Sequence, residues 1–514
     1  MHEFSGDRSV SPTSLALLLL PVASVAALIY TAVYRLYLSP LAKFPGPKLA
    51  ALSSAYTFYY DVVKRGKLPF ELKRLHEEYG PIIRITPHEL HVVDPDFFDV
   101  LQGGSGEKRD KDITALSGFG LTRSVIAAKG HDLHRMRRAA LNPFFSKQAV
   151  VRLEARTIRA KIDKLCEKFK RYQETNEPVN LEHAFVAMTT DIMTEYSFNQ
   201  CYNHLDKPGF FPEYSKLLIT TAESSNLFRY FPFIIDWLMA SPPWLVAKMD
   251  PSLTPLIGMK SDQKAIIERV QESLSCGEKD EKKRTIFHDL IESEVLPPAE
   301  RSTQHLVEAG QIIVSAGSVT TVHFLKTILY FIVANRPILE RLTAELKQAI
   351  PNASEIPPTH VLEALPYLTA VIKECSRFCD GASSRLARIV PDRELQFQQW
   401  TIPRGTSVSM SSWIQHHNPD VFPDPDTFDP QRWLGDRKLD KYLVNFSKGA
   451  RGCLGINLAR SEMYLTTATL IRRFEFELFE TSRSDVDMAH DFFVPYSSVD
   501  SKGVRMLVKK SIPV

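Results

Sequence analysis

Cysteine is scarce in this sequence, with six residues in 514, and no two of them form a CxxC pair. A chain of this size would need many more cysteines for a disulfide framework. We therefore expect reduced, mostly buried thiols in a protein that faces the cytosol. Charge of one sign is also lacking, because 63 Lys and Arg stand against 60 Asp and Glu. The net charge of +3 gives no indication of a nucleic-acid partner. No GxGxxG, Walker-type or flavin motif occurs, so the sequence shows no nucleotide- or flavin-binding motif of its own.

Charged residues are absent from Val10 to Tyr34, and this run is mostly apolar. It is long enough to cross a bilayer as a helix. A cleaved signal peptide is the alternative, but the run leads into the aromatic and basic segment Tyr34 to Tyr37, which favours a retained anchor. Because Arg35, Lys43 and Lys48 follow the run, the positive-inside bias predicts a single-pass protein with its bulk in the cytosol.

We assign residues 1–36 to this anchor and residues 37–49, which contain several prolines, to a stiff hinge. Residues 50–514 show no repeat and no break in composition, so they are expected to form one large domain. Helical periodicity is found at 306–333, 365–378 and 454–474, and strand-like patterns at 81–93 and 395–413. The predicted fold is mainly α with a minor β portion, a single large domain behind an N-terminal transmembrane helix.

Cys453 stands just before a helical stretch, within the glycine-rich segment FSKGARGCLG. The positive end of a helix dipole favours an anion at such a position. The surrounding glycines allow backbone N–H groups to approach the sulfur closely. Phe446 can cover the site with an apolar ring, and Arg451 can bind an acidic group of a ligand. This combination suits a thiolate that is held against a metal in a dry pocket.

The same segment resembles the haem-binding signature F-x-x-G-x-R-x-C-x-G of the cytochrome P450 family. All five fixed positions are met, by Phe446, Gly449, Arg451, Cys453 and Gly455. The resemblance implies the cytochrome P450 fold, with haem b as the cofactor and the Cys453 thiolate as the axial ligand of its iron.

A second motif, Glu374-x-x-Arg377, lies on one face of a predicted helix, with Arg432 further along the chain. An E-x-x-R pair alone is usually a surface pair that contributes little. The resemblance implies that Glu374, Arg377 and Arg432 form a buried network that braces the haem-binding loop.

The segment AGSVTT on the long helix is similar to the family pattern A/G-G-x-D/E-T-T above the haem. The resemblance implies that Ala316 and Gly317 let the helix bulge and leave room for dioxygen, and that Thr320 positions the oxygen and relays protons. Val319 occupies the place of the family's acid, so waters or Ser318 would have to replace it. A helix-packing site of small residues is the alternative.

Cationic groups for the two haem propionates are also implied by the resemblance. His134-x-x-x-Arg138 is similar to the family's W-x-x-x-R helix, and Arg385 matches an arginine beyond the E-x-x-R helix. Together with Arg451, these residues are expected to bind the propionates, with a surface role for each as the alternative.

A thiolate ligand favours O–O cleavage on haem iron. The resemblance therefore implies a monooxygenase that inserts one atom of O2 into a lipophilic substrate at the endoplasmic reticulum membrane. NADPH–cytochrome P450 reductase would supply the electrons, with cytochrome b5 left open as a second donor. The chain is similar to fungal enzymes of secondary metabolism of the trichodiene oxygenase-like type, so we expect a terpenoid or polyketide.

Two alternatives remain: a haem-thiolate isomerase or dehydratase without external oxygen, motivated by Val319, and a non-catalytic haem-binding membrane protein. The expected substrate contacts are mainly apolar and lie in 113–129, the long helix, 381–384 and 492–495. Arg135, Arg137 and Lys448 are candidates for docking an acidic flavoprotein face, or simply solubilising charges.

Overall fold

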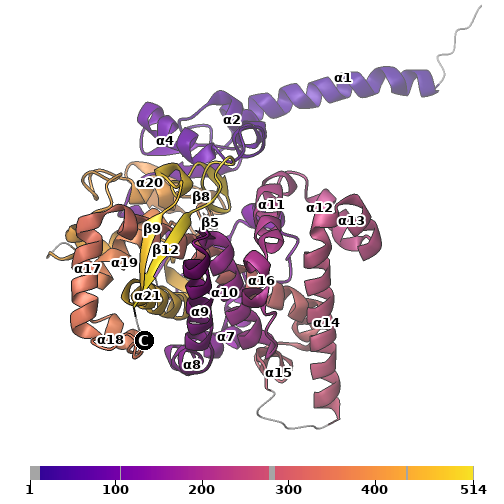
Figure 1. Ribbon diagram of the computed structural model, residues 1–514. Coiled ribbons are helices and arrows are strands. Elements are labelled where there is room, and N and C mark those ends of the chain that lie inside the picture. Colours follow the sequence, from indigo (N-terminus) through magenta and orange to yellow (C-terminus); the bar gives the residue numbers. More distant parts are fainter. Residues whose placement is uncertain (1–11, 105, 277–283, 436–437, 513–514) are drawn as a thin grey trace, which may run out of the picture.

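The computed structural model describes residues 12–104, 106–276, 284–435 and 438–512. Helices make up most of the body, and small sheets lie to one side of it (Figure 1). The helices of eight residues or more are α1 (Pro12–Val33), α4 (Leu68–Tyr79), α7 (His131–Leu141), α9 (Arg159–Thr175), α10 (Leu181–Phe198), α11 (Pro212–Phe228), α12 (Pro232–Ala240), α14 (Thr254–Ser275), α16 (Thr303–Ala334), α17 (Arg336–Ala349), α19 (Pro366–Phe378) and α21 (Ile456–Arg473). The expected α-rich fold with a minor β portion is confirmed.

The largest sheet has five strands in the order β1-β2-β8-β5-β3. Its members are β1 (Ile82–Arg84), β2 (Glu89–Val92), β8 (Ser407–Ser409), β5 (Arg388–Ile389) and β3 (Asp110–Lys111). Strands β1 and β2 pair antiparallel, as predicted for 81–93. The smaller sheets contain β4 (Val179–Asn180), β12 (Arg505–Ser511) and β9 (Phe474–Leu478), then β6 (Leu395–Phe397) with β7 (Trp400–Ile402), and β10 (His490–Phe492) with β11 (Val494–Tyr496).

The predicted long helix is α16, and it contacts α10, α14, α19 and α21. Apolar residues cover most of its surface, so it is buried on nearly all sides. The bulge expected at Ala316 and Gly317 is absent, because Thr303–Ala334 is an uninterrupted α-helix. A Cβ on Gly317 would lie 2.7 Å from the Met193 Sδ of α10. This glycine therefore allows close packing of α16 against α10.

The N-terminal helix α1 projects away from the body (Figure 1). Residues 20–38 form a stretch that is long and apolar enough to span a membrane, and it is unburied. Helix α16 is also long and apolar enough, but most of it is buried in the core. Residues 1–11, which include the acidic N-terminal end of the predicted anchor, lie outside the described residues.

The segment predicted as a hinge is packed onto the body. Leu41 and Phe44 are buried, and the Phe44 ring stacks on Trp400 with ring centroids 5.1 Å apart. Gly46 has φ +142°, and a Cβ there would lie 2.6 Å from the backbone oxygen of Arg84. The segment following α1 is thus held firmly against the sheet side of the domain.

Candidate functional site

The Cys453 loop is folded back on itself by its own backbone hydrogen bonds. The Cys453 N–H donates to the Phe446 carbonyl at 2.7 Å, and the Gly452 N–H donates to the Gly449 carbonyl at 3.1 Å. Gly449 has φ +65°, and a Cβ there would lie 2.7 Å from the backbone oxygens of Gln102 and Gly103. Only glycine fits this turn without strain, so the loop is held against α5 (Phe97–Gln102) and leads directly into α21.

Cys453 is exposed to solvent, although protein atoms surround its sulfur on most sides. Burial raises the pKa of its thiol, while a backbone hydrogen bond from Gly455 and the nearby Arg138 guanidinium act in the opposite direction. Burial therefore favours the neutral thiol, and a metal cation at the sulfur would stabilise the thiolate.

Two residues of α16 are also open, although the helix runs through the core. Ala316 is exposed and Thr320, one turn later, is half-buried. The Thr320 hydroxyl donates to the Ala316 carbonyl at 2.9 Å. An exposed face in the middle of an otherwise buried helix indicates an internal space beside these two residues.

The Ser318 side chain points away from the open face of α16 and towards α10. Its side chain is 1% exposed, and its hydroxyl donates to the Val314 carbonyl at 2.9 Å and lies 3.3 Å from the Thr190 hydroxyl of α10. The expectation that Ser318 replaces the missing acid therefore finds no support in its position, since it faces α10 and not the open face of α16.

Glu374 and Arg377 are both fully buried on α19, and Arg432 reaches them from the segment Pro430–Trp433. The guanidinium of Arg377 donates to both Glu374 oxygens, at 2.7 and 3.2 Å, and Arg432 Nε donates to Glu374 Oε1 at 3.2 Å. Trp433 Nε1 and the Asp429 N–H donate to the same carboxylate, at 2.8 and 3.0 Å. The structure thus brings the three predicted residues together and adds two donors that the sequence did not indicate.

Arg377 also connects this network to the chain that precedes the Cys453 loop. It donates to the backbone carbonyls of His416, Pro425 and Thr427, at 2.9, 2.6 and 3.1 Å. The His416 ring in turn accepts the Val444 N–H at 3.0 Å and meets Asp380 at 2.7 Å. The carboxylate of Glu374 therefore sits at the centre of a rigid support for the loop.

Cations gather beside the cysteine loop without forming ion pairs among the described residues, and Asp110 is the carboxylate that acts on Arg451. Lys111 and Arg388 pair directly across strands β3 and β5, an arrangement that is unfavourable for like charges. Arg388 is 1% exposed, and burial, then Arg451, lowers its pKa to about 9. Burial lowers the pKa of His134 to about 3, with Arg451, Lys111 and Arg138 acting in the same direction.

The hydrogen bonds of these cations go almost entirely to neutral groups. Arg451 donates to the carbonyls of Arg109, Ala128 and Lys129, at 3.0, 2.8 and 2.7 Å, and Arg138 donates to the Gly452 carbonyl. Among the described residues none of Lys111, Arg388 and Arg451 forms an ion pair with a carboxylate. Buried positive charge of this density is costly unless an anion balances it.

These features fit the expected haem. The cations and His134 would meet its two propionates, the Cys453 sulfur would meet its iron, and the open face of α16 would lie over its other side. A haem of this kind requires a free thiol, cations that lack ion-paired carboxylates and an open helix face. Residues on neighbouring elements provide all three.

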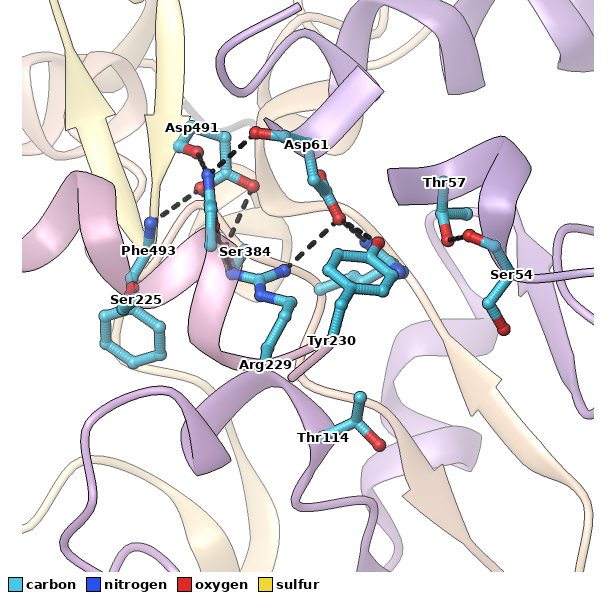
Figure 2. Close-up of polar contacts among 12 residues, drawn as sticks. Ser54, Thr57, Asp61, Thr114, Ser225, Arg229, Tyr230, Ser384, Asp491 and Phe493 are labelled. Carbon is cyan, nitrogen blue, oxygen red and sulfur yellow. Dashed lines mark hydrogen bonds and ion pairs between the residues drawn. The ribbon is translucent and has the colours of Figure 1, made fainter. Parts of the chain in front are cut away.

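Arg385 is placed differently from its predicted role. Its Nε donates to Glu89 at 3.0 Å, and its Nη1 lies 3.7 Å from Asp61. Asp61 also accepts hydrogen bonds from Tyr230 and Arg229, at 2.6 and 3.5 Å, beside the pair of Ser384 and Asp491 (Figure 2). Arg385 thus pairs with the carboxylates of Glu89 and Asp61. Arg388, three residues later, lies among the cations beside the cysteine loop, where Arg385 was expected.

Lys111 and Arg388 were missed in the sequence. The repeat Arg385-Leu-Ala-Arg388 offers two arginines at a similar distance beyond α19, and only the strand register distinguishes them. Two of the predicted docking residues are also occupied: Arg137 forms a double hydrogen bond with Glu300 at 2.7 and 3.0 Å, and Lys448 binds Asp99 at 2.6 Å. Arg135 remains exposed.

Apolar residues line one wall near the open face of α16. Ala222, Phe492, Val494 and Tyr496 are buried together, with Ile219, Val319 and Phe493 packed against them. Phe493 lies at the turn between β10 and β11 and has φ +73°. Its ring meets Phe119 edge to face, with ring centroids 5.1 Å apart. Two of the predicted substrate segments, 113–129 and 492–495, are therefore in contact.

Comparison with known proteins gives a consistent result. Residues 54–500 match the family model "Cytochrome P450". The chain is 43% identical to a cytochrome P450 monooxygenase from Ascocoryne sarcoides, over 93% of this chain and 95% of that protein. It is 38% identical to a tryptophan 6-hydroxylase from Fusarium equiseti (96% and 98%) and 34% identical to the cytochrome P450 monooxygenase TRI4 from Trichoderma arundinaceum (90% of each).

Proposed function

This chain belongs to the cytochrome P450 family and is a haem-thiolate monooxygenase, and from that premise we propose that it oxidises a lipophilic secondary metabolite. Electrons from NADPH would come through NADPH–cytochrome P450 reductase, at the endoplasmic reticulum membrane. The observation that carries the proposal is the open Cys453 sulfur beside cations that lack ion-paired carboxylates, together with an apolar wall beside α16.

The apolar wall supports a terpenoid or polyketide substrate. The cluster formed by Phe492, Val494 and their neighbours offers carbon surface, and such a wall favours an apolar ligand by the area it removes from water. The relatives differ in what they are named for, since one is a tryptophan hydroxylase. The substrate class therefore rests on this wall.

When bound, the haem with a thiolate ligand supplies O–O cleavage, and the reaction consumes R–H, O2, NADPH and H⁺ to give R–OH, H2O and NADP⁺. The Cys453 sulfur would hold the cofactor through its iron, and Arg138, Arg388, Arg451 and Lys111 would hold its propionates. Cys453 must lose its thiol proton to become the ligand, and the Gly455 N–H and Arg138 favour that ionised form. Thr320 presents its hydroxyl on the open face of α16.

The projecting helix α1 supports the proposal that the chain has a membrane anchor. Residues 20–38 are apolar and unburied, and the chain that follows them is fixed to the body by Phe44 and Gly46. The anchor would thus hold the domain close to the bilayer, where lipophilic substrates accumulate. On the cytosolic side, exposed Arg135 of α7 lies one turn before Arg138, so this helix is suited to bind an acidic reductase or cytochrome b5.

Arg388→Met should weaken cofactor retention, whereas Arg385→Met should not affect it comparably. The first change removes a buried cation that lacks a carboxylate partner, and the second breaks the pairs with Glu89 and Asp61. A charge-assisted contact to a propionate is worth about 1.5–3 kcal/mol, roughly a ten- to hundred-fold change in affinity. Haem content per folded protein, measured after dialysis, would show this order. Equal losses in both variants would contradict the assignment of Arg388.

The proposed reaction is tested with labelled oxygen. Membranes that contain the chain and the reductase, supplied with NADPH and a terpenoid or polyketide extract under ¹⁸O2, should yield products that carry one ¹⁸O atom. The isomerase or dehydratase alternative predicts products without ¹⁸O and without a need for NADPH. A carrier without catalysis would give no product at all.

A further inference from the structure

A second cavity, with a volume of about 110 Å³, lies beside the C-terminal part of α16. Its walls come from α16, the end of α19, helix α20 (Ser412–His416) with the residue that follows it, and the segments around Asp426 and 483–488. Thr327 of its wall lies two turns beyond Thr320, about 10 Å further along the helix axis. No residue of the apolar wall around Val494 lines it. The cavity is therefore separate from the haem and substrate sites.

Aromatic rings form much of the wall of this cavity. Phe331, Phe378 and Trp413 line it, and an aromatic face attracts a cation that lies within about 6 Å of the ring centre. The guanidinium carbon of Arg483 already lies 5.9 Å from the ring centroids of both Phe331 and Phe378. That distance is near the outer limit of the interaction, so the rings leave room for a cation that lies closer.

The charge of the lining is negative. Asp426 and Asp487 supply two carboxylates, and Arg483 supplies one cation, which pairs with Asp487 at 2.8 Å. Asp426 has no ion-pair partner in the described part of the chain. Burial raises the pKa of Asp487, with Asp426 acting in the same direction and Arg483 and His417 opposing it. Because burial lowers the pKa of His417, its ring is neutral at pH 7 and one negative charge is left unbalanced.

A buried hydroxyl of the same wall is also left without a partner. Thr327 is 1% exposed, and its Oγ1 has no hydrogen-bond partner among the described residues. A threonine within a helix can bond the carbonyl of the preceding turn, as Thr320 does with Ala316. An unpartnered buried hydroxyl is costly unless water or a ligand satisfies it. Thr327 therefore offers a hydrogen bond to a molecule in the cavity.

We propose that this cavity binds a small alkylammonium ion of the choline type. The aromatic rings would surround its methyl groups and its charge, Asp426 would balance the charge, and Thr327 would bind its hydroxyl. The volume suits such an ion, because a cavity of about 150 Å³ holds a benzene molecule. Arg483, which now approaches the rings, would move aside and keep its pair with Asp487.

The site shares its walls with the support of the Cys453 loop. Phe378 directly follows Arg377, whose guanidinium carbon lies 4.4 Å from the centroid of the Phe378 ring. The backbone carbonyls on either side of Asp426 both accept hydrogen bonds from Arg377. A bound ion would therefore contact the segments that hold this arginine in place.

A ligand-observed NMR titration of the haem-loaded full chain, in a detergent without ammonium groups, tests the proposal with choline as the probe. The matched control ligand is 3,3-dimethylbutan-1-ol, a neutral molecule of the same shape in which carbon replaces nitrogen. Choline should bind at least about five-fold more tightly, because contacts with the rings and the carboxylate depend on its charge. Equal affinity for the two ligands, or no binding of choline at about 10 mM, would overturn the proposal.

Asp426→Asn removes the carboxylate that has no ion-pair partner and should weaken choline binding at least about two-fold, without affecting the neutral alcohol. Asp424→Asn is the matched control, since Asp424 is an exposed acid two residues away that does not line the cavity. Its φ of +49° is one that asparagine tolerates well. This variant should bind choline as wild type does. An unchanged affinity in Asp426→Asn would contradict the assigned counter-charge and with it the site.

Arg483→Gln should strengthen choline binding by about two-fold or more, because the internal cation no longer competes for the rings and for Asp487. Arg483 is exposed, so the change should leave the fold intact. Damage to the cavity would weaken binding, so a gain of affinity distinguishes competition from a structural effect. An affinity equal to or below that of wild type would contradict binding on these rings.

Two sources offer this ion, a free amine and the choline headgroup of a lipid. In phosphatidylcholine nanodiscs a headgroup ligand would fill the cavity and abolish the binding of added choline, whereas phosphatidylglycerol nanodiscs would leave that binding as in detergent. Equal binding of choline in both kinds of nanodisc would identify a free amine as the ligand. Loss of binding in both kinds would overturn the proposal, since the site would then exist only in detergent.

Discussion

Glu374→Gln should prevent the protein from accumulating in folded form. The carboxylate accepts hydrogen bonds from Arg377, Arg432, Trp433 and the Asp429 N–H, and it is fully buried. A neutral amide leaves the Arg377 charge buried without its counter-charge, and breaking a buried pair in this way costs about 3–5 kcal/mol. The whole free energy of unfolding of a domain is only about 5–15 kcal/mol.

The amount of full-length protein in membranes, and its thermal midpoint, would measure this effect. Glu475→Gln is the matched control, because Glu475 is 62% exposed and lies 3.9 Å from Lys510. That change should cost less than about 1 kcal/mol. If Glu374→Gln accumulated and melted like wild type, the buried network would not be the support that its geometry indicates.

Cys453→Ser should abolish turnover while leaving the fold intact. Cys453 is exposed, and its sulfur accepts a backbone hydrogen bond from Gly455, so a change from sulfur to the smaller oxygen should disturb little packing. A serine hydroxyl does not ionise near neutral pH and cannot replace the thiolate as an electron-donating ligand. NADPH-dependent product formation should fall below detection, with a thermal midpoint of the haem-free protein close to that of wild type.

Cys453→His provides a matched comparison, since histidine also binds haem iron but lacks the thiolate charge. It should retain some haem and still give no oxygenated product. Product formation by either variant at more than a small fraction of the wild-type rate would show that turnover does not depend on the Cys453 thiolate.

The sequence was informative where a local pattern determines structure. Helical periodicity placed α16, α19 and α21 to within about three residues, and the glycine spacing around Cys453 predicted a tight loop before a helix. The spacing of Glu374 and Arg377 put both on one helix face. These features depend on contacts within a few residues along the chain, so they can be recognised without the fold.

Other features depend on long-range register and were missed or misplaced. Arg385 and Arg388 are alike in the sequence, and only the pairing of β5 with β3 puts Arg388 opposite Lys111. The bulge expected at Ala316 and Gly317 is absent from the continuous helix α16, and Gly317 instead allows close packing on Met193 of α10.

The central claim is that Cys453 binds haem iron as a thiolate. A reduced, CO-bound difference spectrum of membranes that express wild type and Cys453→Ser tests it most directly. Thiolate ligation by Cys453 predicts a strongly red-shifted Soret band for wild type and its absence in the variant. A wild-type spectrum typical of histidine-ligated haem, unchanged by Cys453→Ser, would contradict it.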